Sequence, residues 1–185
     1  MRELEELIEA LEQLPTIGRK SATRLALHIV KNRPQGLRLA KAIQEAVSQI
    51  GECQLCGGLA AGAICEICKD EGREPIVALV ESWEDVERLE QSGEYHGYYF
   101  LFPEKPTFDR IQKLREFIES LGIGEVIIAF TPSLANRLKG EQIKELLQLP
   151  NLQFTILAQG VPTGVKFENI DTYSLISALK HRYPL

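Results

Sequence analysis

The sequence predicts an α+β protein built from several modules. Apolar residues recur at helical spacing through roughly the first 50 positions, which indicates an all-helical beginning. All four cysteines lie between Cys53 and Cys68. After them, short β-like runs alternate with helical segments, a pattern typical of an α/β part with a mainly parallel sheet. With 185 residues, the chain can bury one good core or divide into small modules.

The first 50 residues are expected to form three helices. The first covers 2–13 and ends at a turn containing Pro15 and Gly18, since proline disfavours helix in the residue before it and glycine tolerates positive φ. The second covers about 19–31 and the third about 37–50. We expect the second helix to bury Ala22, Leu25, Ala26, Ile29 and Val30, and the third to bury Leu39, Ala40, Ile43, Ala46, Val47 and Ile50.

Four strands are expected after the cysteines, at 75–80, 97–102, 125–130 and 152–158. Ser82 caps a helix that runs to about Glu90, with Asp85 completing a capping box. Further helices cover 107–121 and a stretch to about 149 that is interrupted near Gly140. A loop at 160–164 and a last helix, from Asp171 to about Lys180, follow. Core packing is the favoured role of the aromatic residues Trp83, Tyr95, Tyr98, Tyr99 and Phe100, with stacking on unpaired bases as the alternative.

Positive charge is concentrated near the beginning of an acidic chain. The net charge is −5, but residues 13–44 contain seven basic residues and no acidic one, whereas residues 1–12 contain five acidic residues and one basic residue. A local basic block of this size is how a small nucleic-acid-binding module looks inside a mixed protein. Charge alone slightly favours the alternative, a solvated helix face.

The four cysteines form two CxxC pairs, Cys53 with Cys56 and Cys65 with Cys68, separated by eight residues. Two such knuckles complete the tetrahedral four-sulfur shell that zinc favours, and four protein ligands leave no position for substrate. The spacing therefore predicts one structural zinc ion per chain. The alternatives are a redox dithiol or unrelated thiols.

The segment 14–26, LPTIGRKSATRLA, is typical of a helix-hairpin-helix, in which a small turn and the start of the second helix face a DNA phosphate. Lys20, Arg24 and Lys31 fall on one narrow stripe of the second helix. Together with Arg19, they are the predicted DNA-binding residues. An ordinary helical turn with a solvated basic face is the alternative.

Glu81 follows the first strand of the α/β part, where open sheets tend to place their sites. A metal-dependent phosphotransfer site would need further carboxylates near another strand end. The segment after Phe130, TPSLANR, contains none. A single carboxylate is a poor magnesium site, so a structural role for Glu81 is favoured.

These pieces together resemble the RecR family of recombination mediators over nearly the whole chain. The resemblance rests on LPTIGRKSATRLALHIV, the four cysteines, VALVESWEDVERLEQSGEYHGYYFLF, EVIIAFTP, LAQGVPTG and DTYSLISALKHRYPL, in the family's order. It implies a helix-hairpin-helix, a four-cysteine zinc finger and a Toprim-like domain. The family's DNA-contacting positions would fall on Lys20 and Arg24, its zinc ligands on the four cysteines, and its Toprim glutamate on Glu81.

The chain departs from the family pattern at several places, including a shortened loop between Phe102 and Ile111 and Val165 in place of the second glycine after the GVP stretch. Thr16 stands where the hairpin's first glycine is expected, and residues 131–137 lack the acidic residues implicated in partner contact. The expected domains are a helix-hairpin-helix module at 1–52, a zinc finger at 53–73, a Toprim-like domain at 74–166, and a C-terminal helix and tail at 167–185.

The resemblance implies a non-enzymatic, cytoplasmic protein of homologous-recombination repair. It would bind double- and single-stranded DNA without sequence preference, form a dimer or tetramer ring, and act with RecO and RecF proteins to promote recombinase loading on gapped or single-stranded DNA. The alternative is a metal-dependent Toprim enzyme acting on nucleic-acid phosphodiesters. No apolar run approaches the ~20 residues of a membrane span, so we expect no membrane partner.

Overall fold

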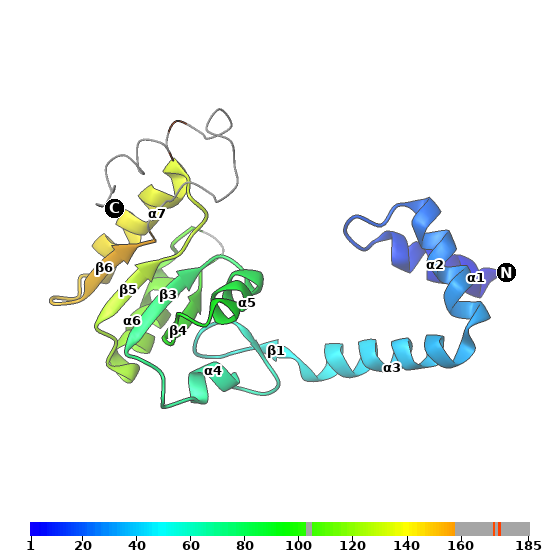
Figure 1. Ribbon diagram of the computed structural model, residues 1–185, viewed down its shortest axis with the longest axis horizontal. Coiled ribbons are helices and arrows are strands. Elements are labelled where there is room, and N and C mark those ends of the chain that lie inside the picture. Colours follow the sequence, from blue (N-terminus) through cyan, green and yellow to red (C-terminus); the bar gives the residue numbers. More distant parts are fainter. Residues whose placement is uncertain (103–104, 158–171, 173, 175–185) are drawn as a thin grey trace, which may run out of the picture. The chain divides into compact units, whose positions relative to one another are not determined.

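The computed structural model describes residues 1–102 and 105–157, together with Thr172 and Ser174. The chain folds as two compact units, Met1–Gly51 and a second that begins at Glu52 (Figure 1). The loop predicted at 160–164 lies outside the described residues, and so does the helix predicted from Asp171 to Lys180 apart from Thr172 and Ser174. Within the described part of the chain, no helix has the length and apolar character needed to cross a membrane.

The first unit consists of α1 (Arg2–Glu12), α2 (Arg19–Lys31) and α3 (Arg33–Gln49), as the apolar spacing predicted. Its core lies between α1 and α2, where Ile8 packs against Ala22 and Ala26. Small alanine side chains let the two helices approach closely. Partly buried residues around them are Leu4, Leu7, Leu11 and Ile17.

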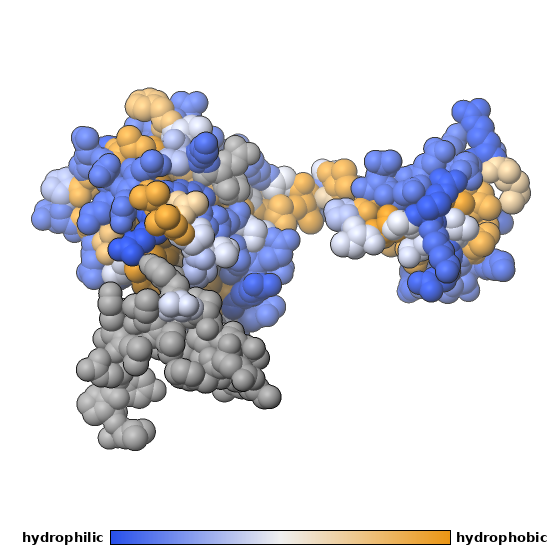
Figure 2. Space-filling model, turned by 90° about the horizontal axis from the view of Figure 1, so that it is seen from above, coloured by the Kyte–Doolittle hydropathy of each residue, from blue (hydrophilic) through white to orange (hydrophobic). Residues whose placement is uncertain are grey.

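The third helix differs from its prediction in both start and burial. It begins at Arg33 rather than near residue 37, with Pro34 in its first turn, where a missing backbone N–H costs nothing. None of its residues is buried, so the predicted burial of its apolar face is wrong. Leu25 and Val30 of α2 are exposed too. Figure 2 shows apolar residues exposed along α3. Helical spacing identifies an apolar face. Whether another part of the same unit packs on that face depends on the tertiary structure.

The second unit is built on a four-stranded sheet with the order β4-β3-β5-β6 (Figure 1). Its strands are β3 (Ile76–Val80), β4 (Tyr98–Leu101), β5 (Glu125–Ile128) and β6 (Gln153–Ile156), and every pairing is parallel, as predicted. The central strand β3 is almost wholly buried, which its continuous apolar run explains. Tyr98, Tyr99 and Phe100 are core residues, as the favoured interpretation held.

Helices cover both faces of this sheet. Val80 and Tyr99 face α5 (Trp83–Ser92), whose predicted capping box between Ser82 and Asp85 is present. The residues that alternate with them along the strands, such as Leu79 and Phe100, face α6 (Phe108–Leu121) and α7 (Leu134–Leu147). The predicted interruption at Gly140 is wrong, because α7 continues through it. A Cβ at Gly140 would lie 3.2 Å from Cγ2 of Ile128, so this glycine lets α7 pack closely on β5.

The cysteine segment forms a small hairpin and a single helical turn. β1 (Gly51–Glu52) pairs with β2 (Leu59–Ala60), and α4 (Glu66–Lys69) follows. All four cysteines are buried in the same hydrophobic cluster as Leu79, Phe100 and Leu114 of the sheet and α6. The knuckles are therefore part of the second unit's core.

Candidate functional site

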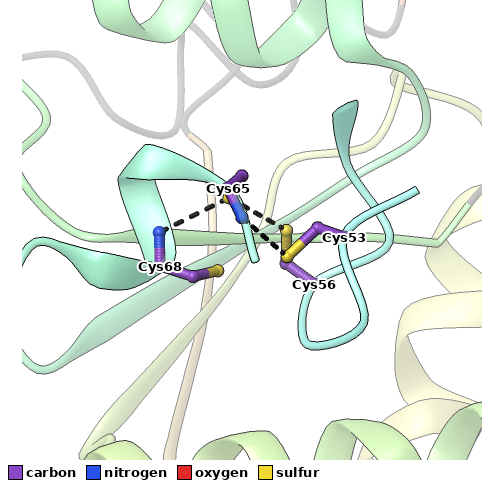
Figure 3. Close-up of side chains that lie close together, drawn as sticks. All are labelled: Cys53, Cys56, Cys65 and Cys68. Atoms are coloured by element: carbon purple, nitrogen blue, oxygen red, sulfur yellow. Dashed lines mark hydrogen bonds between the residues drawn. The ribbon is translucent and has the colours of Figure 1, made fainter. Parts of the chain in front are cut away.

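The four cysteine thiols converge on one point. Their Sγ atoms all lie within 4.8 Å of one another, and all four residues are buried. Figure 3 shows Cys65 and Cys68 on the α4 side facing Cys53 and Cys56 on the hairpin side. Two knuckles with facing sulfurs match the four-coordinate arrangement that structural metal sites use. The cluster could hold one metal ion.

Backbone amides point at three of these sulfurs. The N–H of Gly58 donates to Cys56 Sγ at 3.3 Å, that of Cys65 to Cys53 Sγ at 3.3 Å, and that of Cys68 to Cys65 Sγ at 3.4 Å. Hydrogen bonds to the charged form of a group favour that form. Gly57 makes the tight turn possible with a φ of 77°. The knuckles are therefore built for thiolates.

The pKa values of Cys56, Cys65 and Cys68 favour a cation at the centre of the cluster. The hydrogen bond with Cys56 lowers the pKa of Cys65, which holds the first negative charge. The same contact raises the pKa of Cys56 to about 12, and the contact with Cys56 raises the pKa of Cys68 as well. Neighbouring thiols cannot all ionise together unless a positive charge compensates them. A metal ion held at the centre could supply that charge.

The hairpin turn keeps its geometry despite Thr16. This threonine has a φ of 68°, in the left-handed region that glycine favours, and a β-branched residue there is strained. The N–H of Ile17 donates to the carbonyl of Leu14 at 3.2 Å, which closes the turn. Gly18 is the N-cap of α2, so no side chain caps this helix. Its first-turn amides remain free for an external anion.

The predicted DNA-binding residues fall into two groups. Lys20, Arg24 and Lys31 lie on α2 and are exposed. Arg19 instead forms ion pairs with Glu5 and Glu12 of α1, the second at 3.1 Å, and the hydrogen bond with Glu5 raises its pKa. Arg19 thus ties α1 to α2, whereas none of the other three forms an ion pair with a carboxylate among the described residues.

Glu81 lies at the carboxyl end of β3, next to the end of β5, where connections leave the sheet in opposite directions. Its Oε2 accepts hydrogen bonds from the N–H of Thr131 at 2.9 Å and from Nδ2 of Asn136 at 3.1 Å. Nζ of Lys139 lies 3.6 Å from its Oε1. The carboxylate is therefore already engaged by groups of this chain.

Lys139 brings a positive charge to the place where a Toprim-type cation would be expected. Its Nζ donates to the carbonyl of Phe102 at 2.6 Å and lies 4.1 Å from the ring centroid of Phe130. Burial lowers the pKa of Lys139, an effect that Glu81 opposes. Among the described residues, the four cysteines form the only cluster of three or more potential metal ligands, so Glu81 belongs to no such cluster.

Comparison with known proteins bears on all three sites. The family model described as the RecR helix-hairpin-helix matches residues 4–47. A protein from Nitratiruptor sp. named "Recombination protein RecR" is 48% identical over 178 residues, spanning 95% of this chain and 93% of its own length. Proteins of the same name from Campylobacter jejuni and Helicobacter pylori are 39% and 38% identical, over 98% and 95% of this chain and 96% and 92% of their own lengths.

The chain belongs to the RecR family.

This membership confirms the predicted helix-hairpin-helix, four-cysteine knuckle and α/β architecture. The structure adds residues to these sites that the sequence did not assign to them, namely Trp83, Asn136 and Lys139. No local motif marks them, since Trp83 on α5 contacts Gly58, and Asn136 and Lys139 on α7 contact Glu81, each far away in the sequence. Trp83 is instructive, because a Cβ on Gly58 would lie 2.8 Å from the Trp83 ring. The indole therefore lies directly against the cysteine hairpin.

We expect metal loss to change the fluorescence of Trp83, the chain's single tryptophan. Chelation should loosen the hairpin on which the indole rests and increase its exposure to water, which shifts the emission to longer wavelength. Cys53→Ser should bind substoichiometric metal and show the shifted spectrum without chelator. Gln54→Ala, an exposed neighbour in the same hairpin, is the control and should match the parent. A parent spectrum indifferent to complete metal removal would contradict this expectation.

A second prediction concerns the pairing of Glu81 with Lys139. Glu81→Gln should lower the free energy of unfolding by about 1–3 kcal/mol, because it leaves a largely buried ammonium without its carboxylate. Lys139→Met in the same chain should recover part of that loss. Urea unfolding of both single variants and the double variant gives a coupling energy, expected to be about 0.5–3 kcal/mol. Additive effects would show that the two groups do not interact. Lys144→Met, an exposed lysine on the same helix, is the control.

Proposed function

We propose that this protein is a non-enzymatic DNA-binding mediator of recombination repair. It would act in the cytoplasm with RecO and RecF proteins to promote recombinase loading on gapped or single-stranded DNA. The observation that carries the proposal is the hairpin itself, an uncapped helix start beside an exposed basic stripe in a chain of the RecR family. The relatives' shared name, "Recombination protein RecR", supports the role in recombination.

DNA binding follows from the physical chemistry of the hairpin. A phosphate oxygen can accept from the first-turn amides of α2, where the helix dipole also favours negative charge. No acidic residue occupies that turn. Lys20 and Arg24 lie one helical turn apart and extend the contact along a phosphate backbone, with Lys31 further along the helix. Such contacts do not read bases, so binding would be independent of sequence on double- and single-stranded DNA.

Zinc is the ion we propose for the four cysteines. Four thiolates suit its tetrahedral preference, and the closed shell leaves no position for water or substrate. The site would contribute folding energy, and each chain would hold one ion.

The proposal that this protein is not an enzyme rests on the surroundings of Glu81. A Toprim enzyme acting on phosphodiesters, the alternative function, needs several carboxylates to hold magnesium. Glu81 is instead hydrogen-bonded to Thr131 and Asn136 and paired with Lys139. We therefore propose a structural role for Glu81.

Self-association is proposed on the exposed apolar face of the first unit. Val47 has 78% of its surface exposed and Leu37 66%, although both lie on a helix with an apolar stripe. Exposed patches of this kind mark interaction sites in soluble proteins. A second copy of the same face would cover it and produce a dimer or a tetramer ring. The residues are Leu25, Leu27, Val30, Leu37, Leu39, Ile43, Val47 and Ile50.

The DNA proposal is tested by salt-titrated binding of a Lys20→Ala, Arg24→Ala double variant. Each lost phosphate contact should reduce the slope of log affinity against log salt concentration by about 0.9 on duplex DNA and about 0.7 on a single strand. Sequence preference should not change. Fluorescence anisotropy at several salt concentrations measures both.

The matched control is an Arg88→Ala, Lys113→Ala variant, which removes the same charge from exposed positions of the second unit. It should bind like the parent. If the hairpin variant kept the parent's affinity and salt slope at equal metal content and oligomer size, the basic stripe would be only a solvated surface.

The self-association proposal is tested by Ile43→Glu with Val47→Glu on α3. Charges placed in an apolar interface should lower the molar mass measured by light scattering toward that of the monomer, because the carboxylates would be desolvated without partners. Gln44→Glu adds a charge to an exposed polar position of the same helix and should leave the mass unchanged. An unchanged mass in the Ile43, Val47 variant would place the interface elsewhere.

A further inference from the structure

A half-buried guanidinium lies beside the cysteine hairpin. Arg110 extends from α6, and its Cζ lies 4.3 Å from the ring centroid of Phe100. Its Nε donates to the carbonyl of Leu101 at 3.0 Å, and its Nη2 donates to the carbonyl of Cys56 at 3.2 Å. A Cβ on Gly57 would collide with the same guanidinium. Arg110 is therefore packed directly on the turn that follows a metal ligand.

Arg110 makes no ion pair with a carboxylate among the described residues. Its hydrogen-bond acceptors there are backbone carbonyls. Arg73, the other partly buried arginine of this region, pairs with Glu90 at 2.7 Å. Withdrawing a cation from water is costly unless a negative charge compensates it. The negative groups whose charge acts on Arg110 are Glu52 and Cys56, and both belong to the cysteine segment.

With a metal ion bound, the cysteine centre would carry more negative charge than the single carboxylate of Glu52. Four thiolates around a divalent ion leave a net charge of about −2, and Arg110 donates to the carbonyl of the ligand Cys56. We propose that Arg110 is the counter-cation of the metal centre and the positioning residue of Cys56. The proposal rests on the proposed metal site and adds a residue that the cysteine pattern does not contain.

The same carbonyl also joins the centre to the sheet. The N–H of Leu101, on the edge strand β4, donates to Cys56 O at 2.9 Å, so two donors hold one acceptor. Exposed edge strands pair readily with other chains, and proteins commonly cover them. The knuckle lies at the outer edge of β4, and Arg110 joins the two by donating hydrogen bonds to the carbonyls of Cys56 and Leu101. Arg110 thus couples metal binding to the order of that edge.

The test is competition between the full-length protein and a chromophoric chelator for Co²⁺ at fixed pH. Replacing an outer partner of a metal ligand typically weakens metal binding about 10- to 100-fold. We expect that loss for Arg110→Met, with one ion still bound at saturation and the four-thiolate cobalt spectrum retained. Arg110→Lys, which keeps the charge, should recover part of the affinity. Hydrogen exchange at the Leu101 amide should accelerate in Arg110→Met.

Arg115→Met is the matched control. Arg115 lies on the same helix and also donates to backbone carbonyls, but those belong to Leu146 and Leu147 of α7. This variant should bind Co²⁺ like the parent. If Arg110→Met does not fold, Arg110→Gln carries the same expectation, since it keeps an N–H donor and loses the charge.

The outcomes separate the two hypotheses. A parent that binds cobalt while Arg110→Met or Arg110→Gln binds it equally well overturns the role of Arg110 alone. A parent that binds no cobalt at all overturns the metal centre and this proposal with it. Equal weakening in Arg110→Met and Arg115→Met would show a general loss of stability and would also overturn the assignment.

Discussion

The convergence of four buried thiols is the constraint on which the second unit depends. The segment that carries them has two strands of two residues and one helix of four, too little regular structure to hold itself together. Its sulfurs nevertheless belong to the same cluster as Leu79, Phe100 and Leu114. A metal ion that gathers the thiolates would therefore order one side of the sheet's core as well as the knuckles.

The two units divide charge and apolar surface in different ways. In the first, the core between α1 and α2 is small, and polar capping is missing at the start of α2 because Gly18 stands there. Within the part of the chain that the structure describes, Lys20 and Arg24 form no ion pair, whereas Arg19 pairs with two glutamates of α1. Free amides and free cations together suit a phosphate. The unit's apolar face on α3 suits another protein surface.

In the second unit, side chains of this protein engage a glutamate at a position where α/β folds often place functional groups. Glu81 occupies the switch point of a parallel sheet, where such folds usually bind ligands. Here Asn136 donates a hydrogen bond to its carboxylate and Lys139 forms an ion pair with it, both from α7. A tethered ammonium at that position competes with any divalent ion. Function is therefore argued from the groups around the glutamate, since the fold alone does not determine it.

Local patterns in the sequence determined the element types, the parallel sheet and the four cysteines that gather. Spacing encodes these features, since a CxxC pair or a 3.6-residue period acts over a few neighbours. Burial of α3, the continuity of α7 through Gly140, and the partners of Cys56 and Glu81 were decided only by the tertiary structure. Arg110 meets Cys56 across 54 positions and Asn136 meets Glu81 across 55. Contacts at that separation depend on how the helices pack on the sheet. The spacing of apolar residues within one element does not specify that packing.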